Sequence, residues 1–443
     1  MDIRAAVDGV LPSVRADLER MVRIPSVSAD PDAAVHLGAS AELVAGLLRD
    51  AGLDDAEILT VPDGKPAVVG RRAGPEGAPT VLLYAHHDVQ PGGARADWDT
   101  DPFEPTERAG RLYGRGCADD KAGIAVHLAA LRTFGPELPV GVVVLVEGEE
   151  EIGSPTLQAF LATHRERLAA DVVVLADSSN WTVDVPALTT SLRGGAHVDV
   201  EVRTLDHGLH SGMYGGAAPD ALTALCRLLA TLHDEAGNVA VKGLHSGTSA
   251  APELSESQFR ADAGLLDGVR LLGEGPVTDR LWNRPSLTVI GLDAPPVEGS
   301  SPTLTPVARA ALSLRVAPGD DAGSAQQALV AHLKANAPWG ATVTVTEHGT
   351  AAPYQARLEG RAYDAAHAAF AQAWGTPAVD TGTGGSIPFI AAFAAELPDA
   401  EILITGVEDP DTRAHGANES LHLAMFERCC LAEALLLAAL GAG

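Results

Sequence analysis

Hydrophobic positions at the start of the chain recur at helical spacing. The opening segment keeps this pattern up to Pro25, and a second helix is predicted over residues 33–52, where Gly52 ends it. From Thr80 onward the pattern changes to short, continuously apolar runs. These runs occupy residues 81–85, 141–146, 171–176 and 401–405. Runs this short and rich in β-branched residues are typical of strands buried on both faces of a sheet.

Helical patterns also lie between the apolar runs. Residues 121–134 and 154–169 have the length and spacing of crossover helices that connect parallel strands. The alternation of buried strands with such helices predicts an α/β fold, in which helices cover a mostly parallel sheet.

The middle of the chain has a different texture. Residues 197–204 and 308–316 alternate apolar and polar positions as half-buried strands do, and residues 220–236 are helical in pattern. A chain of 443 residues exceeds what one core usually holds. We therefore expect a smaller α+β domain, residues 190–316, inserted into a main domain made of 1–189 and 317–443. Residues 237–300 are rich in Gly, Ser and Pro, and we draw no function from them.

Composition and charge narrow the class of protein. Hydrophobic residues make up 46% of the chain and charged residues 20%, which is the balance of a globular protein. Lys and Arg number 31 against 59 Asp and Glu, and a net charge of -28 repels phosphate backbones and anionic headgroups. Neither nucleic acid nor a membrane is an expected partner. The four cysteines form no Cys-x-x-Cys pair and the first residues lack the apolar core of a signal peptide, so we expect a cytoplasmic protein.

Acidic and imidazole side chains follow the buried runs. His86 and Asp88 follow the first run, an acidic stretch at 147–151 follows the second, Asp177 follows the third, and His415 lies in a loop after the fourth. Because the carboxyl ends of parallel strands form the ligand crevice of such sheets, these groups should converge. Imidazole and carboxylate are ligands that zinc prefers, so the pattern favours a metal site.

Each of these pieces also has an ordinary structural interpretation. A His-x-Asp after a strand can be a hydrogen-bonded turn, an acidic run is usually a solvated loop, and a single Asp is often a helix N-cap. Their joint occurrence at four strand ends favours the metal site. The glycine-rich stretch at 114–123 lacks the spacing of a nucleotide-binding loop, and residues 384–388 do not form the Gly-x-Ser-x-Gly turn of a serine hydrolase.

Six motifs, in this order and spacing, carry a specific resemblance. They are AHHDVQP, GRGCADDKAG, EGEEEIGS, LAD at 175–177, LHSGMYGG and HGANES. The sequence resembles the di-zinc metallopeptidase family that includes carnosinase-type dipeptidases, aminoacylase, glutamate carboxypeptidase, acetylornithine deacetylase and succinyl-diaminopimelate desuccinylase. The resemblance spans almost the whole chain and implies that residues 190–316 form a lid and dimerisation domain. The chain has Ala85 where the family has Gly, and His87 where it often has Tyr or Thr, but neither position is a ligand in the family.

The resemblance implies a set of metal ligands. It assigns zinc ligation to five residues: His86, Asp119, Glu151, Asp177 and His415. Asp119 would bridge two zinc ions, and the peptide bond that follows it is cis in the family. Asp88 would hold the imidazole of His86 in place, as ligating histidines generally require. Manganese or cobalt could replace zinc at such a site.

The resemblance also implies a general base, Glu150. The family writes this loop as Glu-Glu-x-Gly-Ser, and Gly153 with Ser154 fixes the alignment. A shift by one residue would make Glu149 the base instead. Two zinc ions would activate a bridging water and polarise the scissile carbonyl, while Glu150 accepts the water's proton and passes it to the leaving amine.

Further substrate contacts follow from the resemblance. His210 reaches into the partner's active site in dimeric relatives and stabilises the oxyanion; otherwise it would only cap a turn. Arg315 resembles the lid arginine that clamps a substrate carboxylate, although it could pair locally. Gly385 and Ser386 lie in a loop that resembles one contacting substrate.

The motifs resemble the dipeptidase branch most. We therefore predict a homodimeric, zinc-dependent dipeptidase acting on a small peptide. The alternatives are an N-acyl-amino-acid deacylase with the same mechanism and a catalytically silent metal-binding scaffold.

Overall fold

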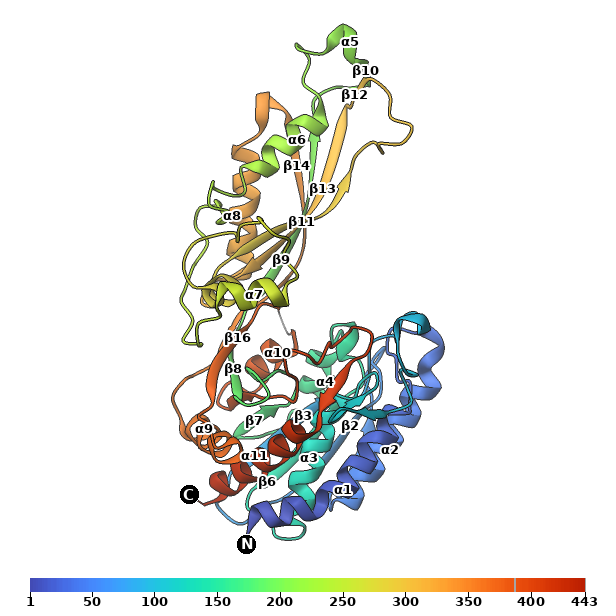
Figure 1. Cartoon of the computed structure of the whole chain (residues 1–443), viewed down its shortest axis with the longest axis vertical. Helices are drawn as coiled ribbons and strands as arrows, with labels where there is room; N and C mark the ends of the chain where they lie inside the picture. The colour runs from blue at the N-terminus through green and yellow to red at the C-terminus, as the bar shows by residue number, and fades with distance from the viewer. Residues whose placement is uncertain (386–387, 443) are drawn as a thin grey trace. The chain divides into compact units, whose positions relative to one another are not determined.

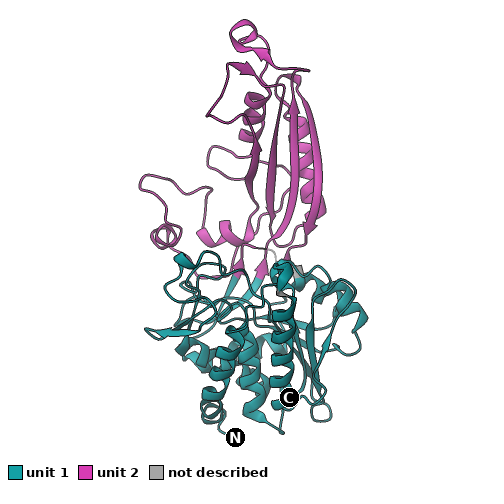
Figure 2. Cartoon of the chain, turned by 90° about the vertical axis from the view of Figure 1, so that its right-hand side faces the viewer, with its two compact units in different colours: residues 1–190, 356–381, 387–443 teal, residues 191–355, 382–386 magenta. Residues whose placement is uncertain are grey.

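The computed structural model describes residues 1–385 and 388–442, which form two compact units (Figure 2). The first unit contains Met1–Thr190, Ala356–Thr381 and Ile387–Gly443, and the second contains Ser191–Gln355 with Gly382–Ser386. Within the described part of the chain, no helix combines the length and apolar character needed to cross a membrane.

The first unit is built on a six-stranded sheet. Its strands, in spatial order, are β1 (Glu57–Leu59), β2 (Ala67–Arg72), β6 (Gly141–Glu147), β3 (Thr80–His86), β7 (Val172–Leu175) and β17 (Glu401–Ile404). Strands β6, β3, β7 and β17 are parallel, whereas β1 and β2 form an antiparallel edge. The prediction of a mostly parallel sheet in an α/β fold is confirmed.

Helices cover both faces of this sheet, because successive side chains of a strand point to opposite faces. Val81, Leu83 and Ala85 of β3 belong to a core shared with one group of helices. This group consists of α1 (Ile3–Val22), α2 (Ala34–Asp50), α3 (Lys121–Phe134), α9 (Arg361–Trp374) and α11 (Leu423–Gly441) (Figure 1). On the other face, the ring of Tyr84 packs 4.6 Å from Phe389 of α10 (Pro388–Glu396), which contacts α4 (Leu157–Thr163).

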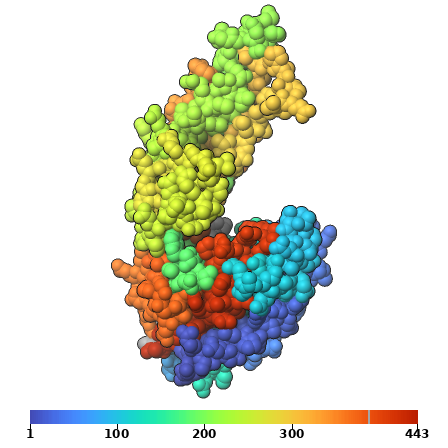
Figure 3. All heavy atoms as spheres, viewed as in Figure 1, coloured from blue at the N-terminus to red at the C-terminus, as the bar shows by residue number. Residues whose placement is uncertain are grey.

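A small antiparallel sheet also belongs to the first unit. It consists of β18 (Ser420–His422), β5 (Arg111–Tyr113) and β4 (Thr106–Arg108). Its pairing of β18 with β5 brings residues near 115 beside residues near 419. The segments around residues 100 and 415, far apart in sequence, also lie side by side at the surface (Figure 3), where Asn418 Oδ1 accepts a 3.0 Å hydrogen bond from the Asp99 amide.

The second unit is a four-stranded antiparallel sheet with helices on one face. Its strands, in spatial order, are β11 (Ser286–Asp293), β13 (Val307–Val316), β9 (Gly194–Arg203) and β14 (Thr342–Ala351). Helices α6 (Ala221–Ala230) and α8 (Ala322–Ala335) pack on it, and the unit also contains the short helices α5 (Ser211–Tyr214) and α7 (Glu256–Asp262).

The second unit is longer than the inserted domain expected at residues 190–316. We expected the inserted domain to end at residue 316, whereas the compact unit continues to Gln355. The reason is that β14 pairs with β9 along most of its length, and α8 packs against both strands. These two elements therefore share the core of the second unit.

Candidate metal centre

The carboxyl ends of the parallel strands in the first unit lie at one edge of the sheet. In the register of the sheet, His86 at the end of β3 lies opposite Glu147 of β6. Leu175 of β7 is paired with Tyr84 of β3 on one side and with Ile404 of β17 on the other. The loops that follow these strands therefore start side by side, which is the arrangement that the sequence predicted.

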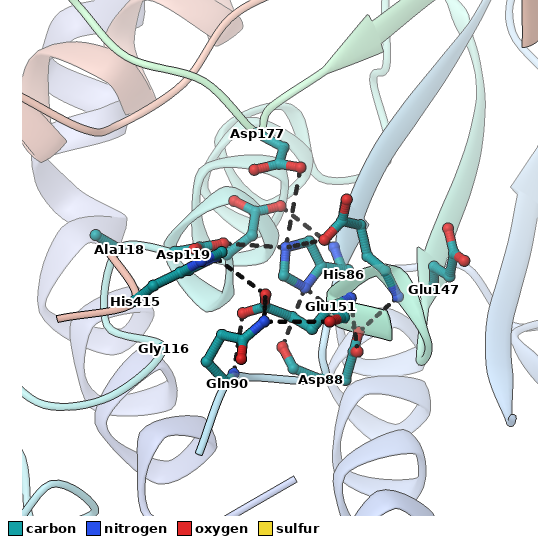
Figure 4. Close-up of polar contacts among 12 residues, drawn as sticks. His86, Asp88, Gln90, Gly116, Ala118, Asp119, Glu147, Glu151, Asp177 and His415 are labelled. Atoms are coloured by element: carbon teal, nitrogen blue, oxygen red, sulfur yellow. Dashed lines mark hydrogen bonds and ion pairs between the residues drawn. The ribbon is translucent and has the colours of Figure 1, made fainter. Parts of the chain in front are cut away.

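Three carboxylates lie around one nitrogen of the buried His86 ring (Figure 4). His86 Nε2 is 3.2 Å from Asp119 Oδ1, 3.9 Å from Asp177 Oδ2 and 3.9 Å from Glu150 Oε2. The other nitrogen, Nδ1, is 3.0 Å from the carbonyl oxygen of Asp88 and 3.4 Å from its carboxylate. Asp177 and Asp88 thus approach the two opposite nitrogens of the ring.

Asp119 also joins a second group of side chains. His415 Nε2 is 3.0 Å from Asp119 Oδ2 and 3.1 Å from Glu151 Oε2. The two carboxylate oxygens of Asp119 therefore face two different histidines. The Asp119–Asp120 peptide bond is cis, as the resemblance implied.

Two sets of possible metal donors arise from this geometry. One set contains Asp119, Glu151 and His415, and the other contains His86, Asp177 and Asp120, each with ligand atoms within 4.8 Å of one another. Asp120 is not among the ligands that the resemblance implies. Its Oδ2 accepts a 3.2 Å hydrogen bond from the His86 amide.

Asp88 organises the acidic loop as well as His86. Its carboxylate accepts hydrogen bonds from the amides of Glu150 and Glu151, at 3.2 and 3.1 Å. These amides begin the short helix η3 (Glu150–Ile152). Because Asp88 is completely buried, these bonds and the approach of His86 Nδ1 supply its partners.

The neighbours Glu149 and Glu150 point in different directions. Glu149 is buried and accepts hydrogen bonds from the Lys65 amide (3.0 Å) and from the Thr156 amide (2.8 Å). Its carboxylate therefore stabilises the loop through these hydrogen bonds. Glu150 faces His86 Nε2 instead.

Gln90 is a contact that sequence reasoning missed. Its amide N–H donates to Glu151 Oε1 at 2.9 Å, and its side-chain Nε2 donates to Glu151 Oε2 at 2.8 Å. Both oxygens of Glu151 are thus held by one residue. Gln90 stands in the AHHDVQP motif, which does not indicate that its partner is Glu151.

The electrostatics of the cluster suit a cation. Burial, followed by the charge of Asp177, raises the pKa of Glu150 to about 9, and burial raises the pKa of Asp177 to about 7. Hydrogen bonds to Asp119 and Glu151 raise the pKa of His415 to about 10. Carboxylate oxygens and imidazole nitrogens are the donors that zinc and similar divalent ions accept, so the residues present fit a metal centre.

The remaining predicted site residues belong to the second unit or lie outside the described residues. His210 is exposed, and its Nδ1 accepts a 3.1 Å hydrogen bond from the Gly212 amide, so it caps α5. Arg315 lies on β13 opposite Gly195 and forms no ion pair with any described residue. Gly385 is described, whereas Ser386 is not.

Arg193 is a second contact that the sequence did not reveal. It is nearly buried in the second unit, where its Nε donates to the Gly384 carbonyl at 3.1 Å and its Nη1 to Ser286 Oγ at 3.0 Å. Ser286 is the cross-strand neighbour of Arg315 on β11. Arg193 therefore links Gly384, which precedes Gly385, to the strand end that carries Arg315.

Comparison with known proteins identifies the family. A model of peptidase family M20/M25/M40 matches residues 82–439. A Cysteinylglycine-S-conjugate dipeptidase from Corynebacterium striatum is 38% identical over 411 residues, which cover 91% of this chain and 90% of that protein. Beta-Ala-His dipeptidase from Homo sapiens is 27% identical, over 93% of this chain and 83% of that protein.

A solved structure is similar in fold. The di-peptidase Dug1p from Saccharomyces cerevisiae superimposes with a TM-score of 0.76 at 23% identity, covering 100% of this chain and 98% of that one. The family match covers most of the sequence and includes the strands and loops that form the candidate metal centre. The chain therefore belongs to peptidase family M20/M25/M40, and is a metallopeptidase.

Proposed function

We propose that this chain is a zinc-dependent dipeptidase that hydrolyses the amide bond of a small peptide, with Glu150 as the general base. The observation that carries this proposal is the position of Asp119, whose two oxygens face His86 on one side and His415 on the other. The relatives reported above are named as dipeptidases, so the deacylase alternative is not favoured.

Five side chains would hold two metal ions. His86 and Asp177 would bind one ion, Glu151 and His415 would bind the other, and Asp119 would bind both. Asp119 Oδ1 lies 3.2 Å from His86 Nε2 and its Oδ2 lies 3.0 Å from His415 Nε2, which supports Asp119 as the residue shared by the two ions. Zinc is the proposed metal, and manganese or cobalt are possible substitutes because such donor sets accept several divalent ions.

The chain's own residues would supply the proton chemistry. The bound ions would provide Lewis-acid chemistry, which polarises a carbonyl and makes water more acidic. The Glu150 carboxylate lies beside the donor atoms, where it would accept the proton of the attacking water and return it to the leaving amine. Asp88 would fix both the His86 ring and the first amides of η3, and so would aim Glu150.

Residues of the second unit would recognise the substrate. Arg315 would bind the carboxylate of the peptide, and the loop with Gly385 and Ser386 would contact its backbone. Arg193 supports these roles because it donates hydrogen bonds to Gly384, which precedes Gly385, and to Ser286, the cross-strand neighbour of Arg315. His210 would act from the partner subunit and stabilise the oxyanion.

A homodimer through the second unit is part of the proposal. Strand β11 is an edge of its sheet and exposes three apolar side chains, Val289, Ile290 and Leu292. An exposed apolar edge strand is a ready surface for pairing with a second copy. The cytoplasmic location stays a prediction.

The test of this proposal is a substrate panel assayed with the metal-loaded protein. Dipeptides, including an S-conjugate of Cys-Gly and β-Ala-His, should be hydrolysed, and exhaustive chelation should abolish turnover until zinc, manganese or cobalt is returned. Preferential hydrolysis of N-acetyl or N-succinyl amino acids would instead support the deacylase. A protein that binds metal and hydrolyses no amide of the panel would support the scaffold.

A further inference from the structure

We propose that Arg115 and Glu419 form a buried latch that positions the two segments carrying Asp119 and His415, so that metal affinity depends on the latch. The proposal rests on the proposed metal-binding function. Neither residue is among the candidate ligands. Both act through other residues and are positioning residues.

The Glu419 carboxylate holds the loop that leads to Asp119. Its Oε1 accepts hydrogen bonds from the amides of Ala118 (3.1 Å) and Asp119 (3.2 Å). Its Oε2 accepts from the Gly116 amide (3.1 Å) and from Arg115 Nη1 (2.6 Å). Three backbone amides of this loop therefore donate to one carboxylate, and the last of the three is the amide of Asp119 itself.

The Arg115 guanidinium reaches two further segments. Its Nη2 donates to the Gly416 carbonyl at 3.0 Å and to the Pro91 carbonyl at 3.4 Å. Gly416 follows His415 directly, and Pro91 follows Gln90, which holds Glu151. One ion pair thus joins three segments that are remote in sequence and that each lie next to a candidate ligand or its holder.

The segment with His415 needs such external contacts. Arg413, His415 and Asn418 have φ angles of 58°, 62° and 61°, in the left-handed region that non-glycine residues seldom adopt. A backbone of this kind persists only where its surroundings hold it. The bond from Arg115 to Gly416 lies within this segment, and Glu419 follows it directly.

Burial of the pair argues for a positional role rather than a general contribution to stability. Arg115 is 2% exposed and Glu419 is fully buried. A buried ion pair contributes little net stability, because removal of two charges from water offsets their attraction. The geometric effect is distinct: without the carboxylate, the amides of Ala118 and Asp119 lose their common acceptor, and the Asp119 loop is free to shift.

The test compares Glu419→Gln with a matched control, Glu433→Gln. Glutamine keeps the size of Glu419 but presents an NH₂ donor to amides that also donate. Glu433 is likewise buried and pairs with His127 Nδ1 at 2.9 Å, but it contacts neither Asp119 nor the His415 segment in the described structure. For each protein we would measure the absorption spectrum of the cobalt-loaded form, cobalt and zinc affinity by chelator competition, and the melting temperature of the metal-free form.

We expect Glu419→Gln to weaken metal affinity about 10- to 100-fold, the range found for residues that hold ligands, and to change the cobalt spectrum. Glu433→Gln should lower the melting temperature but keep the wild-type spectrum and affinity. If Glu419→Gln does not fold, Arg115→Lys is the second variant, because it keeps the positive charge and loses the planar guanidinium. It should show the same loss of metal affinity and the same change of cobalt spectrum, each to a smaller degree.

The latch proposal would be overturned if the folded Glu419→Gln variant kept the wild-type cobalt spectrum and metal affinity. The same result in Arg115→Lys would overturn it where that variant replaces Glu419→Gln. Equal changes in Glu433→Gln would overturn it too. A wild-type protein that binds no metal would overturn the proposed metal centre, and the latch with it.

Discussion

Adjacent side chains in the acidic loop have opposite environments. Glu149 is tied to the amides of Lys65 and Thr156, whereas Glu150 faces His86 Nε2 at 3.9 Å. A general base must reach the water that it deprotonates, so the orientation of Glu150 suits that role and the orientation of Glu149 does not.

Substitution of each glutamate separates the two assignments. Glu150→Gln should lower kcat about 10²- to 10⁴-fold, the usual contribution of a general base, because glutamine cannot accept the proton. Metal content should stay near that of the wild type, since the predicted ligands are intact. Glu149→Gln should cost stability through its lost loop contacts and keep most of the turnover. Steady-state kinetics and metal analysis measure both effects, and an inactive Glu149→Gln beside an active Glu150→Gln would reverse the assignment.

The candidate ligands at the strand ends could be predicted from the sequence, but the residues that hydrogen-bond to the ligands could not. His86 is the last residue of β3 and Asp177 lies two residues after β7, so the sheet itself determines their positions. Gln90 and Glu419 also stand in recognisable motifs. Their roles depend on contacts with Glu151 and Asp119, residues 61 and 300 positions away, and no local pattern encodes such pairings.

Among the elements, the buried strands and long helices were predicted best. Strand β3 covers residues 80–86, around the apolar run at 81–85, and α3 covers 121–134, as its helical pattern predicted. Helix α4 stops at Thr163, although the helical pattern continues to 169, and α6 stops at Ala230 rather than 236. Amphipathic patterns often extend past the last intact turn, so helix ends are harder to predict than helix positions.

Strand β11 was missed, and its exposure explains why. It lies at the edge of the second unit's sheet, where most of its side chains are exposed, and its pairing with β13 shifts between Val289 and Gly291. An edge strand with a bulge lacks the strict apolar alternation by which strands are predicted. The surrounding sequence is rich in Gly, Ser and Pro, so no strand pattern could be recognised there.

At the scale of the whole molecule, the expected inserted domain of residues 190–316 and the compact unit of Ser191–Gln355 differ in where they end. Helix α8 and strand β14 have ordinary patterns that fit either unit. They belong to the second unit because β14 pairs with β9. This pairing joins residues that are far apart in sequence. Oligomeric state belongs to the same scale, because it depends on surfaces and not on a motif.

The proposed homodimer yields a complementation experiment. Glu150→Ala and His210→Ala should each be inactive, because one removes the general base and the other the oxyanion donor. If His210 acts in the partner's site, mixed dimers contain one site with both groups, and mixing the two variants should restore part of the activity. Subunit exchange is followed by native mass spectrometry. No recovery in samples that contain mixed dimers would refute the action of His210 across the dimer.

The central claim is that side chains from residues 86 to 415 meet around a pair of metal ions. The most direct measurement is anomalous X-ray scattering at the zinc edge from crystals of the zinc-loaded protein. We predict two anomalous peaks, one beside His86 and Asp177 and the other beside Glu151 and His415, with Asp119 contacting both. A single peak, or peaks away from Asp119, would contradict the account.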